Sequence, residues 1–245
     1  MRKATLVLAV CGLLTVASAV AVENPVEVRS YGHAFVLITS PQGMRIAMDP
    51  FGQIGYPMPD IEADVVTVSH GHSDHNNAAL IKGKPKILRG LAPGGKDWAV
   101  IDYQEKGVRI RSFPGYHDKV QGKQRGLNGI FLVEAAGLRI VHMSDIGQLP
   151  SQRVLDSLGQ IDLLFVPVGG HFSIDANEAT ALVERLKPAV VIPIHYKTDI
   201  TASWPIFDEQ AFVQGKPRVK SVGHRVKISK NTLPTEAEIW VMSYR

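Results

Sequence analysis

Three histidines and one aspartate lie within six residues of the chain, in the segment SHGHSDHN at residues 69–76. In an extended chain His70 and His72 point the same way, because side chains repeat every two residues. We expect Asp74 and His75 to lie where the chain turns into a helix, so that they face a second point nearby. Both residue types bind metals, and two such points suit two metal ions held close together. A solvated loop that is rich in histidine is the alternative interpretation.

The composition restricts the kind of metal site that the chain can build. Its 245 residues include nine histidines and one cysteine, Cys11. A single cysteine excludes an intramolecular disulfide, a cysteine-rich zinc module and an iron–sulfur cluster. The metal ligands are therefore expected to be histidines and carboxylates. With 27 basic and 23 acidic residues, the net charge of +4 is too small to predict a nucleic-acid partner.

Short β-type runs and two helices must position these side chains. Nine runs read as strands, several of them apolar enough to be buried on both faces, at residues 35–39, 44–48, 65–69, 108–113, 129–133, 138–143, 163–168, 190–194 and 239–242. One helix is predicted near residues 151–158. A second begins after Asp175, has Glu178 in its first turn and ends before Pro188. Strands that dominate early and alternate with helices later predict a layered α/β fold.

Residues 1–21 are typical of a signal peptide. Two basic residues precede the apolar run 4–16, and small-residue cleavage sites end at Ala19 and Ala21. An uncleaved membrane anchor is the alternative, since the 18 uncharged residues that begin at position 4 could barely span a bilayer. Cleavage leaves one domain at residues 22–245, without cysteine and with a net charge of +2. It predicts a periplasmic or secreted protein that has no stable membrane anchor.

The pattern H-x-H-x-D-H after an apolar run resembles the metal-binding motif of the metallo-β-lactamase superfamily. The resemblance covers nearly all of residues 22–245 and implies the superfamily's α/β fold, a four-layer αββα sandwich. Four further residues match the family's pattern in order, each after a strand-like run: Asp49, His117, Asp145 and His195. Together they imply a hydrolase whose activity depends on metal ions.

The resemblance also implies how the metal ions are held. Two divalent ions would share seven ligands: His70, His72 and His117 for the first, Asp74, His75 and His195 for the second, and Asp145 between them. Asp49 would support the metal-binding loop. All these ligands are nitrogen or oxygen donors and leave open positions for water, so zinc is expected first, with manganese and iron as alternatives.

Three segments narrow the resemblance to one branch of the superfamily. The commonest zinc β-lactamases place a cysteine at the second metal, and residues 22–245 contain none. The segments GH at 32–33, PVGGHF at 167–172 and IPIHY at 192–196 resemble a compact branch that includes ascorbate-6-phosphate lactonase. Ser144 is a departure, because the family usually has glycine before the bridging aspartate. Its side chain is small enough to leave the ligand in place, at the cost of a narrower site.

Spacing excludes two other branches. Nuclease members insert a large domain between the bridging aspartate and the last histidine, whereas here only 50 residues separate Asp145 from His195. Glyoxalase-type members append a helical domain after the last histidine, whereas here 50 residues follow it and read mostly as strand and loop.

The expected activity is hydrolysis of a small ester, lactone or phosphoester by a metal-bridged hydroxide. Asp74 would orient the water and accept its proton. His171, which follows two glycines at the end of a strand, is the candidate proton donor. His33, His142 and His224 are each either partners of the site or hydrogen-bonded histidines elsewhere. A non-catalytic periplasmic metal-binding or sensing protein and a β-lactamase are the alternative functions.

Substrate selectivity is expected in the loops at residues 52–60 and 118–128. The second loop begins after His117 and carries Lys119, Lys123 and Arg125. These basic residues would attract an anionic small-molecule substrate, although a solvated loop is the simpler explanation.

Overall fold

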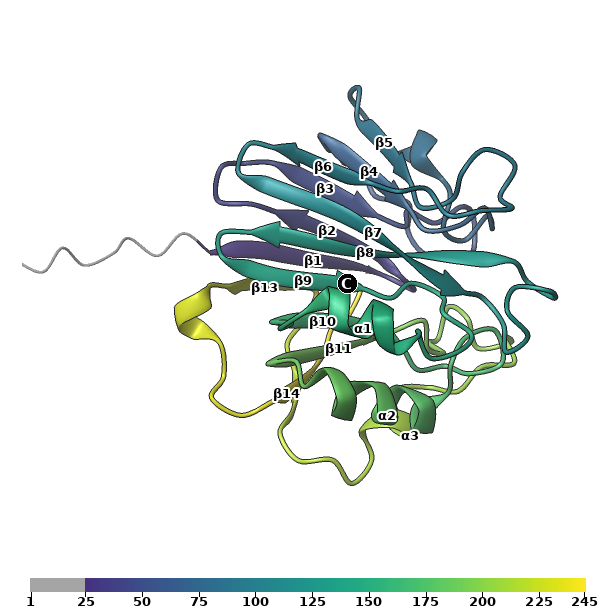
Figure 1. The fold of residues 1–245 in the computed structure, drawn as a ribbon. Helices are drawn as coiled ribbons and strands as arrows, with labels where there is room; N and C mark the ends of the chain where they lie inside the picture. Colours follow the sequence, from purple (N-terminus) through teal and green to yellow (C-terminus); the bar gives the residue numbers. More distant parts are fainter. Residues whose placement is uncertain (1–24) are drawn as a thin grey trace, which may run out of the picture.

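Two β-sheets pack face to face and form the body of the molecule (Figure 1). The computed structural model describes residues 25–245, and the predicted leader at residues 1–21 lies outside the described residues. The main core lies between the sheets, where Val28 and Ile46 of one sheet join the same buried cluster as Phe131 and Phe165 of the other. The predicted layered α/β fold is confirmed.

The first sheet has six strands in the order β13-β1-β2-β3-β4-β5. In chain order they are β1 Val26–Gly32, β2 Phe35–Thr39, β3 Arg45–Met48, β4 Val65–Val68, β5 Lys86–Arg89 and β13 Arg225–Ile228. β3, β4 and β5 are parallel, so the ends of β3 and β4 reach one edge of the sheet. Alternate residues face opposite sides, so Val36 and Ile38 of β2 enter the core between the sheets while Phe35 faces outward.

The second sheet has eight strands in the order β12-β14-β11-β10-β9-β8-β7-β6. They are β6 Asp102–Glu105, β7 Val108–Tyr116, β8 Leu127–Ala135, β9 Leu138–His142, β10 Leu163–Pro167, β11 Val190–Ile194, β12 Val219–Ser221 and β14 Glu238–Val241. β9, β10 and β11 are parallel, and β7 and β9 are each antiparallel to β8. β7 therefore runs in the same direction as β9, and the carboxyl ends of β7, β9, β10 and β11 meet at one edge.

Three α-helices cover the outer face of the second sheet, namely α1 Gln152–Leu158, α2 Ala176–Leu186 and α3 Gln210–Val213 (Figure 1). The two predicted helices are confirmed. Ser151 caps α1 through its side chain, which accepts a hydrogen bond from the Val154 backbone. Asp175 and Glu178 form the predicted capping box at the start of α2.

Within residues 25–245, loops and not α-helices cover the outer face of the first sheet. Phe51, Tyr56 and Ile81 pack there against Phe35 and Val66. The helical structure in this layer is one 3-10 turn, η1 Ala78–Leu80, and a second turn of this kind, η2 Lys230–Thr232, precedes β14. The fourth layer of the sandwich is thus mostly irregular chain packed on aromatic side chains.

The histidine loop, residues 69–76, follows β4 and differs locally from the prediction. Residues 70–72 bend and residues 73–75 form a turn, in which the His75 backbone N–H donates to the His72 carbonyl at 3.0 Å. The Gly52 N–H donates to the Ser73 carbonyl at 2.8 Å and anchors the turn. The expected extended chain and helix start are therefore wrong. A tight loop makes the side chains converge instead.

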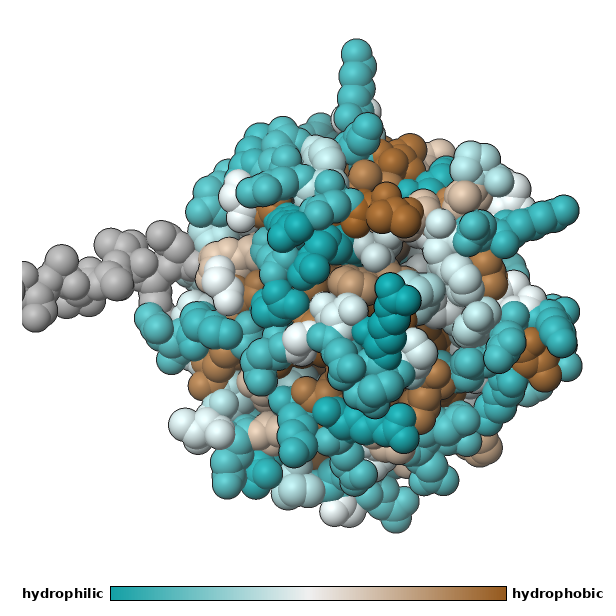
Figure 2. Space-filling view, in the orientation of Figure 1, coloured by the Kyte–Doolittle hydropathy of each residue, from teal (hydrophilic) through white to brown (hydrophobic). Residues whose placement is uncertain are grey.

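The face of the molecule seen in Figure 2 is mostly hydrophilic, and its apolar side chains lie in small separate groups. The most exposed large apolar side chains include Val100 and Phe207. Within residues 25–245, no helix has the length and apolar character that a membrane crossing requires.

Candidate metal centre

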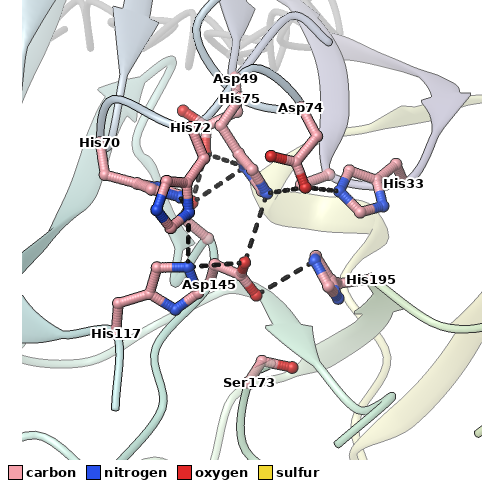
Figure 3. Close-up of polar contacts among 12 residues, drawn as sticks. His33, Asp49, His70, His72, Asp74, His75, His117, Asp145, Ser173 and His195 are labelled. Atoms are coloured by element: carbon pink, nitrogen blue, oxygen red, sulfur yellow. Dashed lines mark hydrogen bonds and ion pairs between the residues drawn. The ribbon is translucent and has the colours of Figure 1, made fainter. Parts of the chain in front are cut away.

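Three imidazole nitrogens meet where β4 and β7 end (Figure 3). His72 Nδ1 lies 3.1 Å from His70 Nε2 and 3.0 Å from His117 Nε2. Ligands about 2.0 Å from a tetrahedral zinc ion lie about 3.3 Å from one another, so this spacing suits three ligands of one ion. The structure therefore brings together the three residues predicted for the first metal.

Asp145, just beyond β9, lies between this triad and a second group of side chains. Its Oδ2 atom is 3.3 Å from His117 Nε2 and 3.5 Å from His75 Nε2. Its Oδ1 atom is 3.2 Å from His195 Nε2. The two carboxylate oxygens thus contact members of both groups, which is the position required of a bridging ligand.

The second group contains the predicted Asp74, His75 and His195, together with His33. Asp74 Oδ2 lies 3.6 Å from His75 Nε2 and accepts a hydrogen bond from His33 Nε2 at 3.1 Å. The His33 and His195 rings are 4.1 Å apart between centroids. The sequence left His33 open between the site and the core, and the structure places it in the site. The Gly32-His33 pair, noted for the family resemblance, was the signal for it.

Several donor atoms here have the environment of metal ligands. His75 Nε2, Asp145 Oδ1 and His195 Nε2 are buried and make no hydrogen bond. The two histidine nitrogens nevertheless lie within 3.6 Å of carboxylate oxygens of Asp74 or Asp145. The geometry of these contacts does not suit a hydrogen bond. Buried polar atoms without partners are costly, and a shared cation satisfies them. The residues present therefore fit divalent metal ions.

Comparison with known proteins assigns this donor set to a family. The sequence profile of the beta-lactamase superfamily domain matches residues 27–195, from β1 to the last predicted ligand. The chain belongs to the metallo-β-lactamase superfamily. All seven predicted ligands and His33 lie within the matched residues.

Two superfamily relatives are UPF0173 metal-dependent hydrolases. The protein from Thermococcus onnurineus is 32% identical over 203 residues, which cover 74% of this chain and 86% of the relative. The protein from Thermus thermophilus is 32% identical over 224 residues, which cover 82% of this chain and 96% of the relative. This chain is thus similar over most of its length to metal-dependent hydrolases.

A solved structure supports the same conclusion for the fold. A protein from Thermotoga maritima, assigned to the metallo-β-lactamase superfamily as a Zn-dependent hydrolase, has a TM-score of 0.71 and 28% identity to this chain. The match covers 89% of this chain and 98% of that protein. The superfamily fold and its metal dependence are therefore established for this chain, while the finer resemblance to ascorbate-6-phosphate lactonase stays a prediction.

Asp49 supports the metal centre as the superfamily resemblance implied. It is buried, and its Oδ1 atom accepts from the Ser69 backbone N–H at 2.8 Å. Its Oδ2 atom accepts from His75 Nδ1 at 3.1 Å and from the Ser69 hydroxyl at 2.6 Å. Ser69 Oγ in turn lies 2.9 Å from His70 Nδ1. These bonds hold the far nitrogens of His70 and His75, so that Nε2 of each ring is left for a metal.

Ser144, the departure from the superfamily's usual glycine, joins the same network. Its hydroxyl donates to Asp49 Oδ2 and lies 2.6 Å from Ser69 Oγ. Ser144 was expected to narrow the site, but its side chain is buried and lines no part of the cavity described below. Ser144 therefore adds a hydrogen bond to the carboxylate that supports both His70 and His75.

Burial and charge set the protonation of the centre. Burial lowers the pKa of His70 and of His117, and it lowers that of His33 to about 3, so these rings are neutral near pH 7. Burial also acts to lower the pKa of His75, but the nearby Asp145 carboxylate and the hydrogen-bonded Asp49 carboxylate raise it well above its usual value. A metal that binds His75 must therefore displace a proton.

Four residues of the centre have left-handed backbone conformations at strand ends. His33, Asp49, Ser144 and His195 have φ angles of 55°, 48°, 54° and 51°. Such angles are uncommon outside glycine and cost about 1–3 kcal/mol each, so the surrounding structure must hold them. The His195 backbone N–H donates to the His33 carbonyl at 3.0 Å and joins two of these turns across the sheets.

A cavity of about 470 Å³ opens over the centre, with His72, Asp74, His117 and Asp145 in its wall. The predicted selectivity loop at residues 118–128 contributes Arg125 to this wall. The other predicted selectivity loop, residues 52–60, contributes no lining residue to this cavity. Phe172 and the segment Ser203–Pro205 line the cavity instead, and sequence reasoning missed that segment.

The remaining histidines lie apart from the metal ligands. His142 is buried, and its Nε2 donates to the Ala34 carbonyl at 2.9 Å, so it links the two sheets. His224 is half-buried and directly precedes β13. His171 is exposed, and its ring contacts Phe172 at 4.5 Å between centroids. It stands next to the cavity wall, and its role as a proton donor stays a prediction.

Proposed function

We propose that this chain is a dinuclear hydrolase, with His70, His72 and His117 holding one divalent ion and Asp74, His75 and His195 holding the second. The observation that carries the proposal is the position of Asp145, whose two oxygens contact members of both groups. The donors are imidazole and carboxylate, which suit zinc first and also manganese or iron.

When bound, the two ions would lower the pKa of water toward neutrality and polarise the bond that is cleaved. Asp74 would orient that water and accept its proton. Burial acts to raise the pKa of Asp74, but the hydrogen bond from His33 holds it well below its usual range, so the carboxylate is ionised.

The proposed substrate is a small molecule with an ester, lactone or phosphoester bond. A cavity of about 470 Å³ suits a small ligand, and it contains both Asp74 and the bridging Asp145. His171, exposed beside Phe172, would supply a proton to a poor leaving group.

A substrate panel tests this proposal. The purified protein is stripped of metal, reloaded with zinc, manganese or iron, and assayed on aryl and alkyl esters, lactones, phosphomonoesters, phosphodiesters and a chromogenic cephalosporin. We expect turnover of an ester, lactone or phosphoester that disappears on stripping and returns on reloading. A protein that binds metal and cleaves none of these compounds would instead be a metal-binding or sensing protein. Cleavage of the cephalosporin alone would make it a β-lactamase.

We also propose that residues 1–21 direct export and are removed. The basic start, the short apolar run and the small-residue cleavage sites support this. Amino-terminal sequencing of the protein from fractionated cells should begin at Val20 or Val22, in the periplasmic or secreted fraction. Recovery of the full-length chain in the membrane fraction would contradict the proposal.

A further inference from the structure

One wall of the cavity combines a cation with aromatic rings. Arg125 lies on one side, with the centre of its guanidinium 5.4 Å from the centroid of the Phe172 ring. The Phe172 and Trp204 rings meet edge to face at 6.3 Å. Trp204 in turn contacts the ring of His33, 5.5 Å away, so this wall reaches the residue that holds Asp74.

Arg125 has no acidic partner. It is half-buried, and within residues 25–245 no carboxylate pairs with its guanidinium and no hydrogen bond uses it. Its neighbour Lys119, by contrast, forms an ion pair with Glu178 at 2.8 Å. A half-buried guanidinium that faces a cavity without a counter-ion is free to bind an anion there.

The loop that carries Arg125 is held in place beside a metal ligand. Asp118 follows His117 and is buried, and its carboxylate accepts four backbone N–H groups of the loop, those of Val120, Gly122, Gln124 and Arg125. The bond to the Arg125 N–H is 2.7 Å long. The loop is therefore preorganised, and ordering it on ligand binding costs little.

We propose that Arg125 selects substrates that carry a carboxylate or phosphate group next to an apolar body. The guanidinium would bind the anionic group through paired N–H donors, and Phe172 and Trp204 would contact the apolar body. This inference rests on the proposed function, because it assigns the substrate class of the same cavity. It also gives the basic loop at residues 118–128 a role in substrate binding, in place of the simpler explanation of a solvated loop.

Equilibrium binding tests the assignment without any need for turnover. Benzoate, phenyl phosphate and the neutral benzamide are titrated into metal-loaded protein by calorimetry. Arg125→Gln should weaken binding of the anions about tenfold or more, with a much smaller change for benzamide. Arg125→Lys should restore part of the loss. Lys123→Gln, which removes one charge from an exposed position of the same loop, is the matched control and should bind all three compounds like the wild type.

The two anions distinguish the chemistry. A larger loss for phenyl phosphate identifies a phosphate site, and a larger loss for benzoate identifies a carboxylate site. The inference is overturned if the wild type binds neither anion more tightly than benzamide, if Arg125→Gln weakens all three compounds equally, or if Lys123→Gln reproduces the effect.

Turnover separates this inference from the proposed function. A para-nitrophenyl glutarate monoester is compared with the neutral para-nitrophenyl pentanoate, and the ratio of their kcat/KM values should fall about tenfold or more in Arg125→Gln. An unchanged ratio counts against Arg125 as the selecting residue. If the metal-loaded wild type hydrolyses neither these esters nor any other compound of the substrate panel, the proposed function is contradicted, and the binding experiment still decides whether Arg125 holds an anion.

Discussion

At the residue scale, hydrogen bonds hold the ring nitrogens of His70 and His75 that face away from the metal site. Asp49 bonds His75 directly and reaches His70 through the Ser69 hydroxyl. The family resemblance predicted Asp49 as a support, but nothing in the sequence indicated a bond from the hydroxyl of Ser144, which lies 95 residues along the chain from Asp49. Contacts between the ends of different strands depend on how the sheets pack.

Asp49→Asn should weaken metal binding about 10–100-fold, because an amide has one acceptor oxygen: if this oxygen accepts from His75 and the serine hydroxyls, the NH2 group faces the Ser69 backbone N–H, which is also a donor. Competition with a chromogenic chelator measures this affinity. Ser144→Gly removes one of the three bonds and gives the superfamily's usual residue, so its loss should be smaller. Equal affinities for wild type and Asp49→Asn would show that Asp49 does not support the ligands.

His171→Asn should lower kcat about a hundredfold for an alkyl ester, whose leaving group needs a proton. The same change should affect a para-nitrophenyl ester little, because nitrophenolate leaves without protonation. Steady-state kinetics on both esters check the difference. A variant that slows both esters equally, or neither, contradicts the assignment of His171 as the proton donor.

At the element scale, most interior strands were predictable, whereas the interior strand β1 and the edge strands were not. The continuously apolar run at residues 190–194 matches β11, and Asp175 and Glu178 mark the start of α2. β6 reads DYQE and β12 reads VKS, so neither carries an apolar pattern that distinguishes it from a loop. Sheet pairing, which no local pattern records, makes these segments strands. Trp204 was also not predicted, because it reaches the cavity on an irregular segment that has no local sequence pattern.

Gly169→Ala should destabilise the turn that follows β10. A Cβ atom at this position would lie 2.2 Å from the His195 carbonyl oxygen, so the chain that carries a predicted ligand must shift. We expect a loss of about 1–3 kcal/mol in the free energy of unfolding, together with a lower metal content. Denaturant unfolding and metal analysis measure the two effects.

Gly71→Ala is the matched control for Gly169→Ala. Gly71 lies between two predicted ligands, but a Cβ atom there meets nothing within 4 Å. Its stability should equal that of the wild type. If Gly169→Ala also keeps wild-type stability and metal content, close packing of this turn does not position His195.

At the scale of the whole molecule, the site exists because two sheets present strand ends at a common place. β3 and β4 of the first sheet bring Asp49 and the histidine loop, while β7, β9 and β11 of the second bring His117, Asp145 and His195. The family resemblance predicted that these residues lie together, and the structure places them side by side. Residue spacing alone could not show that His33, from the turn after β1, would lie against His195.

The metal-free protein should lose stability as the pH falls from 7 to 5. Burial lowers the pKa of His70 and His142 below the usual 6.5 and that of His33 to about 3, so below pH 6.5 the unfolded chain binds protons that these folded rings do not. The raised pKa of His75 acts in the opposite direction but is one group against several. The free energy of unfolding should fall by about 2 kcal/mol or more. Denaturant unfolding of metal-free protein at both pH values tests this, and equal or greater stability at pH 5 contradicts it.

The number of divalent ions bound per chain tests the dinuclear site most directly. Metal-free protein is reloaded, freed of unbound metal by gel filtration and analysed by inductively coupled plasma mass spectrometry. We predict two ions per chain for the wild type and fewer for Asp145→Ala, because Asp145 contacts members of both ligand groups. A wild type that binds one ion or none, or an Asp145→Ala variant that keeps both, would contradict the dinuclear centre.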